Sequence, residues 1–245
     1  MTVRIMLRLA GAIVLLPAGA AWAQPLEAGA EAVSDDVRAG ISWSGGRASA
    51  SADARLDLGA MDVSLRLATL RRAPRHAGAD LVADVAIGRD WALGPVILRT
   101  EAVGHVFAGA SQSMDFGELV LGVRYGLGPL RLAATAWYAP HQSTIGGDNL
   151  HLRVGADAGL PGVPITLLAS IGHTAGGGQG LRTTRLRPAG DYTDWKLGAE
   201  YARYPLSLGL EYVGTTVATS GAPAGPFADP SGADDRVVAR VRLSF

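Results

Sequence analysis

The sequence has no cysteine, no excess of charge of one sign and no long uninterrupted run of apolar residues. Without cysteine there are no disulfides, so the fold must be closed in another way. The 22 basic and 22 acidic residues balance, which gives no reason to expect a nucleic-acid partner. After residue 23, no stretch reaches the roughly 18 apolar residues of a transmembrane helix. These absences exclude a disulfide scaffold, a polyanion-binding protein and a helical membrane protein.

The N-terminus has the pattern of a secretory signal peptide. Arg4 and Arg8 precede a short apolar segment over residues 13–20, and Ala21-Trp22-Ala23 fits the small-x-small rule for cleavage. We therefore predict a signal peptide over residues 1–23, export through the inner membrane, and a single mature domain over residues 24–245.

Beyond the signal, apolar and polar residues alternate almost end to end, with turn residues between the runs. A period of two is typical of β-strands with two different faces. The alternation predicts twelve strands, at about residues 33–43, 47–58, 61–71, 79–91, 95–107, 115–127, 129–139, 148–160, 163–173, 191–203, 206–217 and 236–245.

One face of each predicted strand is apolar and the other carries the charges. In the first strand, the residues expected to point outward are Val37, Ala39, Ile41 and Trp43. In the last strand they are Val237, Ala239, Val241, Leu243 and Phe245, which also form the expected signal for membrane insertion. Such strands separate lipid from a polar interior, as in outer-membrane barrels.

Short and long connections alternate along the chain. Tight turns at residues 59–60, 92–94, 128, 161–162 and 204–205 alternate with longer links, which is the pattern of a barrel with short periplasmic turns and long outer loops. A soluble β-sandwich also alternates, but its strands average about five or six residues. The sequence therefore predicts an all-β, transmembrane, up-and-down antiparallel β-barrel of about 12 strands in the bacterial outer membrane.

The charged side chains of the opposite face are expected to line the interior. They are Arg38, Arg55, Arg66, Arg99, Glu101, Glu118, Arg124, Arg131, Arg153, Lys196, Glu200, Glu211, Arg236, Arg240 and Arg242. They could form an ion-selective channel for small hydrophilic solutes, or pair into salt bridges that plug a structural barrel. A twelve-stranded barrel lies between those that side chains fill and those that leave a channel, so size alone does not decide. We expect Arg236, Arg240 and Arg242 to lie beside Arg38 after closure and to favour anions.

A lipid-modifying enzyme is a third alternative, because some outer-membrane barrels are hydrolases that use serine and histidine. The five histidines are scattered, Asn149 and His151 have no evident serine partner, and no Gly-x-Ser-x-Gly occurs. No metal-binding spacing is present either. The sequence therefore predicts no enzyme activity, no metal site and no cofactor.

Three segments carry a resemblance to a known family. They are Ser34-Asp35-Asp36-Val37-Arg38-Ala39-Gly40-Ile41-Ser42, the block Asp191-Tyr192-Thr193-Asp194-Trp195-Lys196-Leu197-Gly198 with its continuation to Thr215, and the terminal strand from Arg236 to Phe245. Together they resemble the TorF family of small proteobacterial outer-membrane proteins, which are described as porins. Asp36 and Ala39 depart from the family pattern, which has an aromatic residue and an arginine there. The resemblance implies an outer-membrane barrel in contact with lipid. It also implies assembly by periplasmic chaperones and the barrel-insertion machinery. In the long loop His173–Gly190, three arginines could bind lipopolysaccharide phosphates, fold inward as a constriction or form a solvated basic loop; they are Arg182, Arg185 and Arg187.

Overall fold

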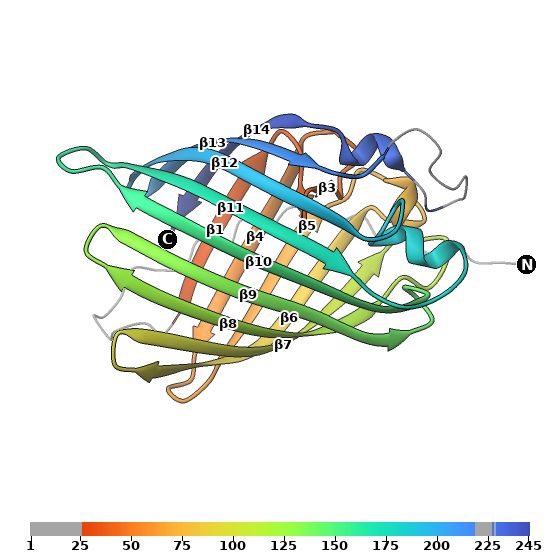
Figure 1. Ribbon diagram of the computed structural model, residues 1–245, viewed down its shortest axis with the longest axis horizontal. Helices are drawn as coiled ribbons and strands as arrows, with labels where there is room; N and C mark the ends of the chain where they lie inside the picture. The colour runs from red at the N-terminus through yellow and green to blue at the C-terminus, as the bar shows by residue number, and fades with distance from the viewer. Residues whose placement is uncertain (1–25, 219–226, 228) are drawn as a thin grey trace, which may run out of the picture.

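The described residues form a closed antiparallel β-barrel of twelve strands (Figure 1). This computed structural model describes residues 26–218, 227 and 229–245, so the predicted signal peptide lies outside the described residues. The wall strands are β1 (Leu26–Val33), β4 (Ser49–Asp57), β5 (Asp62–Thr69), β6 (Leu81–Leu93), β7 (Val96–Ala108), β8 (Phe116–Leu127), β9 (Leu130–Gln142), β10 (Gly147–Gly159), β11 (Ile165–Ala175), β12 (Tyr192–Arg203), β13 (Leu206–Thr215) and β14 (Arg236–Ser244). Each strand pairs with its neighbours in the chain, and β1 pairs with β14 to close the wall. The predicted fold class is confirmed.

The first wall strand differs from its prediction. It is β1, which precedes the predicted segment 33–43 and shares only Val33 with it. Residues 37–42 instead form a small hairpin, β2 (Val37–Arg38) and β3 (Ile41–Ser42), which is a separate two-stranded sheet. Ile41 and Trp43 are buried rather than outward-facing.

The remaining eleven wall strands have the predicted parity. Large apolar side chains on the outward face, such as Leu121, Val154 and Leu210, are more than half exposed. The pairing registers keep them on the same face as their neighbours, for example Val154 opposite Ile171. Parity also places Arg89 outward near one end of β6, where its guanidinium lies 3.8 Å from the Trp91 ring centre. The outer surface is thus an apolar belt.

Tight turns gather at one end of the barrel and long links at the other (Figure 1). We call them the turn end, with links 58–61, 94–95, 128–129, 160–164 and 204–205, and the loop end, with links 70–80, 109–115, 143–146, 176–191 and 216–235. The described chain begins and ends at the turn end, where Phe245 N–H donates to the Ala28 carbonyl oxygen at 2.9 Å. This arrangement was predicted from the alternation of link lengths.

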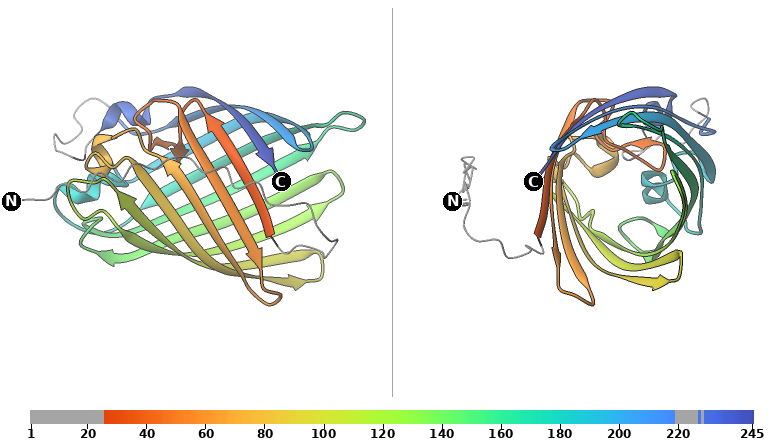
Figure 2. Two further views of the ribbon diagram at one scale, coloured as in Figure 1. Left: turned by 180° about the vertical axis from the view of Figure 1, so that it is seen from behind. Right: turned by 90° about the vertical axis from the view of Figure 1, so that its left-hand side faces the viewer.

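Three short 3-10 helices lie in the described parts of the long links. They are η1 (Pro74–His76), η2 (Leu181–Arg185) and η3 (Pro230–Ala233). Seen from the turn end in the right-hand view of Figure 2, segments of the loop end project across the far opening of the barrel. Within the described ranges, no helix has the length and apolarity needed to cross a bilayer.

Candidate functional site

The hairpin β2–β3 lies inside the barrel and narrows its interior. It reverses direction through Ala39 and Gly40, which both have positive φ, 48° and 74°. Consecutive positive φ values belong to the tight hairpin turns that glycine favours. A Cβ atom on Gly40 would lie 2.6 Å from Asp194 Cβ and 2.5 Å from Thr215 Cγ2. Only glycine allows the hairpin tip to approach β12 and β13 this closely.

The base of the hairpin is held by buried hydrogen bonds. Asp35 accepts from the hydroxyls of Ser42 at 2.6 Å and Ser44 at 2.7 Å, and Ser44 Oγ accepts from the Asp36 N–H at 3.0 Å. At the tip, Tyr192 OH donates to the Ala39 carbonyl oxygen at 2.9 Å. Attachments at both ends fix the hairpin across the lumen.

An apolar core closes the interior at the loop end. It joins wall residues to the long links and to Trp43, which follows the hairpin, and its larger members are Trp43, Leu70, Val82, Phe107, Met114, Phe116, Ile145 and Phe227. We call this core, together with η1 and η2, the cap. The links fold inward because their apolar side chains would otherwise face water.

Two arginines, Arg75 of η1 and Arg185 of η2, are buried side by side in the cap, with exposed fractions of 1% and 0%. Arg75 donates to the carbonyl oxygens of Arg185 at 2.8 Å and Asp229 at 3.1 Å. Arg185 donates in turn to those of Arg75, Met114 and Thr144, at 3.2, 3.1 and 2.6 Å. Neither forms an ion pair with a described carboxylate. These two side chains therefore hold five long links together through backbone oxygens.

Burial without a paired carboxylate changes the ionisation of the cap. Desolvation lowers the pKa of Arg75 to about 10 and that of Arg185 to about 9. It also lowers the pKa of His76 well below its usual range, with the nearby Arg75 and Arg185 charges adding to the effect. His76 packs against the rings of Trp43 and Phe107, at centroid distances of 4.6 and 5.0 Å. The closed cap therefore holds His76 in its neutral form.

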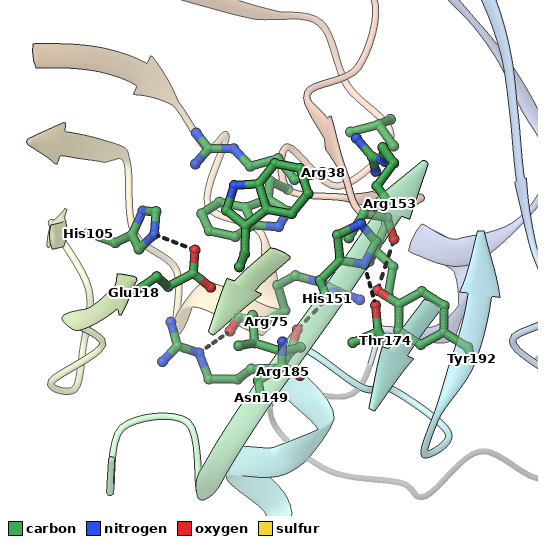
Figure 3. A pocket seen from close by; sticks show the side chains of 16 residues that line it. Arg38, Arg75, His105, Glu118, Asn149, His151, Arg153, Thr174, Arg185 and Tyr192 are labelled. Carbon is green, nitrogen blue, oxygen red and sulfur yellow. Dashed lines mark hydrogen bonds and ion pairs between the residues drawn. The ribbon is translucent and has the colours of Figure 1, made fainter. Parts of the chain in front are cut away.

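A cavity of about 300 Å³ lies beneath the cap, between the inner hairpin and the wall (Figure 3). Its lining combines aromatic side chains, among them Trp43, Trp137 and Tyr192, with the cationic groups of Arg38, Arg75, Arg153 and Arg185. Asp36 and Asp84 are ion-paired with Arg38, and Asp194 with Arg153. The sequence does not single out Arg75, which lies in a link expected to be external. For the loop that carries Arg185, an inward-folded constriction is one of the alternatives that the sequence leaves open, and the structure places Arg185 inside.

Several polar atoms in this lining have no hydrogen-bond partner. Buried nitrogens in this state include Arg75 Nε, Arg153 Nε and His151 Nε2. Arg185 Nη2 is also without a hydrogen bond, although the guanidinium carbon lies 5.2 Å from the Phe107 ring centre. Buried polar groups normally have partners, so these atoms mark the cavity as a candidate binding site.

The same cavity is lined by a threonine and a histidine, and an aspartate lies beside the histidine, but the three are not in a catalytic arrangement. His151 Nδ1 lies 2.8 Å from Thr174 Oγ1 and 3.7 Å from Asp194 Oδ2. In a nucleophilic triad the two partners contact different ring nitrogens, so that the base can pass a proton while it is oriented. Here both partners face the same nitrogen, and Thr174 is fully buried. The geometry does not fit nucleophilic catalysis. Among the residues described, no cluster of histidine and acidic side chains is suited to a metal ion.

Below the cavity, the interior is filled by ion pairs. Asp62 on β5 accepts from Arg99 on β7 in a bidentate contact at 2.8 and 2.9 Å, and from Arg55 on β4 at 2.9 Å. To reach Asp62, Arg99 crosses the intervening strand β6 at Gly88, where a Cβ atom would collide with its guanidinium. Arg99 also contacts Glu101, so the predicted interior residues Arg55, Arg99 and Glu101 lie in one cluster.

A second cluster joins the inner hairpin to the wall. Arg38 pairs with Asp84 of β6 at 3.0 Å, and Arg66 lies 3.6 Å from the same carboxylate. His105 of β7 contacts Asp84 at 2.7 Å and Glu118 at 3.2 Å. Arg38 is thus inside the barrel, as predicted, but on the hairpin rather than on the closing wall strand.

The expected basic wall of β14 is neutralised by acids from neighbouring elements. Arg236 contacts Asp35 at 2.6 Å, Arg240 contacts Glu31 at 3.3 Å and Glu211 at 3.5 Å, and Arg242 contacts Asp53 at 2.6 Å. Arg242 crosses β1 at Gly29, as Arg99 crosses β6 at Gly88. Arg38 is not on the strand that pairs with β14, because β1 brings Glu31 there. Arg38 and Arg240 nevertheless line one space of about 210 Å³ beside β1 and β14.

The other predicted interior residues are distributed along the far wall. Lys196 contacts Glu211 at 2.8 Å, Arg153 contacts Asp194 at 3.1 Å, Arg124 contacts Asp90 at 2.8 Å and Arg131 contacts Asp157 at 2.7 Å. Glu200, opposite Gly209 of β13, has no ion pair with another described residue. The structure therefore brings most of the predicted charges into pairs rather than into one continuous cationic surface.

Comparison with known proteins places the chain in a family. The chain belongs to the bacterial family of unknown function Gcw_chp, whose model matches residues 90–245. The match includes η2 with Arg185 and begins after the inner hairpin and η1. No curated protein matches the sequence.

Solved structures similar to the chain are barrels of low sequence identity. One comes from work on the in-meso crystallization of membrane proteins, with a TM-score of 0.52, 13% identity, and coverage of 89% of this chain and 83% of that one. OprD of Pseudomonas aeruginosa has a TM-score of 0.44 and 12% identity over 90% of this chain and 66% of its own. LpxR of Salmonella typhimurium has a TM-score of 0.46 and 10% identity over 89% and 99%. The first likeness agrees with the barrel fold.

Proposed function

We propose that this protein is a porin-like channel of the bacterial outer membrane that passes small hydrophilic solutes, anions among them, and that its outer mouth is closed by the cap. The apolar belt supports a membrane location, because soluble monomers rarely expose large continuous apolar surfaces. The signal peptide over residues 1–23, if cleaved, supplies export to the periplasm. Assembly would then use periplasmic chaperones and the barrel-insertion machinery, acting on the terminal strand that ends at Phe245.

One observation carries the channel. Three hollow spaces follow one another along the β8–β12 side of the interior and share lining residues. A space of about 520 Å³ at the turn end shares Asp157 with one of about 240 Å³ in the middle of the barrel. The middle space shares Arg153 with the cavity of about 300 Å³ beneath the cap. This series supports a route past the ion pairs that the cap closes at the loop end.

The second candidate is a structural barrel with a plugged interior, and the ion pairs and the buried cap favour it. The TorF resemblance supports the channel, since members of that family are described as porins. Neither function requires contact with lipopolysaccharide or a particular oligomeric state. The enzyme hypothesis has least support, because Thr174 and Asp194 both face the same ring nitrogen of His151.

Planar-bilayer recording of the purified, refolded protein separates the two candidates. The channel predicts discrete conductance steps, and a reversal potential in a salt gradient that favours anions. A matched variant with Arg182→Gln, in the cap but on its exposed side, should give the same steps. A barrel that is folded, as judged by the heat-dependent shift in gel mobility, but never conducts would reject the channel and leave the structural barrel.

A further inference from the structure

The cavity beneath the cap has more buried positive charge than its own carboxylates neutralise. Arg38 and Arg153 have aspartate partners, and the one carboxylate in the lining, Glu118, contacts His105. Arg75 has hydrogen bonds to backbone oxygens only. A buried charge without a counterion is costly, and such groups concentrate at functional sites. Arg185 likewise donates only to backbone oxygens, so the lining carries two guanidinium groups that no described carboxylate contacts directly.

Several buried nitrogens of the lining have no hydrogen-bond partner, and two of them, Arg75 Nε and Arg153 Nε, belong to different elements. Arg75 comes from the cap and Arg153 from strand β10 of the wall (Figure 3). Both side chains line the cavity. Guanidinium groups match the planar geometry of a carboxylate.

The remaining walls suit a flat apolar body. Trp43 and Trp137 line the cavity, and guanidinium carbons lie close to both rings, Arg38 at 4.0 Å and Arg153 at 5.7 Å from the centroids. Ile41 and Leu186 add aliphatic surface. A volume of about 300 Å³ is at the small end of ligand pockets. The space therefore fits a compact molecule rather than a lipid or a peptide.

We propose that this cavity binds a small organic anion, a planar carboxylate on a flat apolar body, with Arg75 and Arg153 as the contact residues. Arg185 is a positioning residue, since its backbone oxygen accepts from Arg75. In the proposed channel the site is the recognition step just inside the cap, so its part in transport rests on that function. Binding itself does not depend on conduction.

Benzoate, its neutral isostere benzamide and inorganic phosphate are the probes. Each is titrated into the full-length protein in detergent, with isothermal calorimetry and the tryptophan fluorescence of the protein as readouts. Benzoate should bind at least about tenfold more tightly than benzamide, because the charge-assisted contact is lost in the amide. Phosphate should bind weakly, since it cannot use the aromatic walls. Equal binding of benzoate and benzamide, or phosphate binding as tight as benzoate binding, would overturn the proposal.

Two variants localise the site. Arg75→Gln should weaken benzoate binding about tenfold or more while benzamide binding stays the same. Arg187→Gln is the matched control, because Arg187 is a largely buried arginine of the loop end, just after η2, that does not line the cavity. Its side chain donates to the Gly177 carbonyl oxygen and pairs with Asp191. Equal effects of the two variants would contradict the site. If Arg75→Gln fails to fold, Arg153→Lys, which keeps the ion pair with Asp194, provides the same comparison.

The outcomes separate this inference from the channel. Benzoate binding without any current leaves the site and rejects the channel. Current without benzoate binding does the reverse. If both are present, benzoate at saturating concentration should reduce the conductance of small anions in wild-type protein and leave it unchanged in Arg75→Gln.

Discussion

The arginines at the two ends of the barrel interior have different hydrogen-bond partners. Toward the turn end, arginines such as Arg99 and Arg242 meet aspartates across an intervening strand. In the cap, Arg75 and Arg185 meet only carbonyl oxygens. An ion pair inside a barrel is strongly destabilised when one partner is removed, whereas carbonyl oxygens released from a guanidinium can be rehydrated when a loop opens. We therefore expect the cap to open more readily than the wall.

The largest effect should come from breaking the ion-pair cluster of the wall. Asp62→Asn removes the carboxylate that holds both Arg55 and Arg99 and leaves two interior cations without it. We expect a loss of about 3 kcal/mol in the free energy of unfolding, measured by urea titration in lipid vesicles. Asp57→Asn is the control, because Asp57 is exposed and accepts only from the Gly59 N–H; it should change stability by less than about 0.5 kcal/mol. Equal losses would show that the cluster does not stiffen the wall.

A smaller effect is expected where an arginine crosses a strand. Gly88→Ala places a methyl group against the Arg99 guanidinium and should cost about 2 kcal/mol, as overpacking usually does. Gly126→Ala, also within a strand but with nothing within 4 Å of the new Cβ, should be close to neutral. In the Asp62→Asn background Arg99 keeps only Glu101 and Asp90 as acidic partners among the described residues and can shift more easily, so Gly88→Ala should cost less. Strict additivity in this double-mutant cycle would contradict the crossing.

The smallest effect is a pH dependence confined to the cap. The closed cap depresses the pKa of His76. Above the ordinary histidine pKa of about 6.5, His76 is neutral in both the open and the closed cap, so it does not change the stability of the cap there. As pH falls through that value, the open cap gains a proton that the closed cap excludes. The closed form should lose about 1 kcal/mol by pH 5.5. Hydrogen exchange of cap amides, such as the Arg187 N–H, should become faster than that of wall amides when the pH is lowered from 7.5 to 5.5. Both sets of rates are corrected for intrinsic exchange. His76→Phe should abolish this difference, and its persistence in the variant would assign the effect elsewhere.

Most of the wall could be predicted from alternation, because successive residues of a strand between two environments face lipid and the interior in turn. Eleven of the predicted strands occupy wall positions in the described structure. The strand β1 was missed because its outward residues beyond Leu26 are Ala28, Ala30 and Ala32, which carry little hydrophobic signal. Glu27, Glu31 and the glycine between them at position 29 were the available sign of an inward face.

The inner hairpin was mistaken for a wall strand because it also alternates. Val37, Ile41 and Trp43 would suit a lipid-facing side, but they pack in the interior instead. The Ala39-Gly40 pair marked a turn, and Asp35 with Asp36 marked a break before it. The cap could not be predicted from pattern, because Arg75 and Arg185 lie in irregular links where no period exists. Their partners are backbone oxygens, which the sequence does not distinguish.

The inner hairpin is joined to the wall by very short tethers. Residues 34–36 connect it to β1, and three residues span about 10 Å at full extension. Ser34 is further fastened to β14, where its N–H donates to the Ala239 carbonyl oxygen at 2.9 Å. With so short a connection and a tip bonded to Tyr192, the hairpin stays inside the barrel. It therefore divides the interior unequally, with spaces of about 240 and 520 Å³ on the β8–β12 side and one of about 210 Å³ beside β1 and β14.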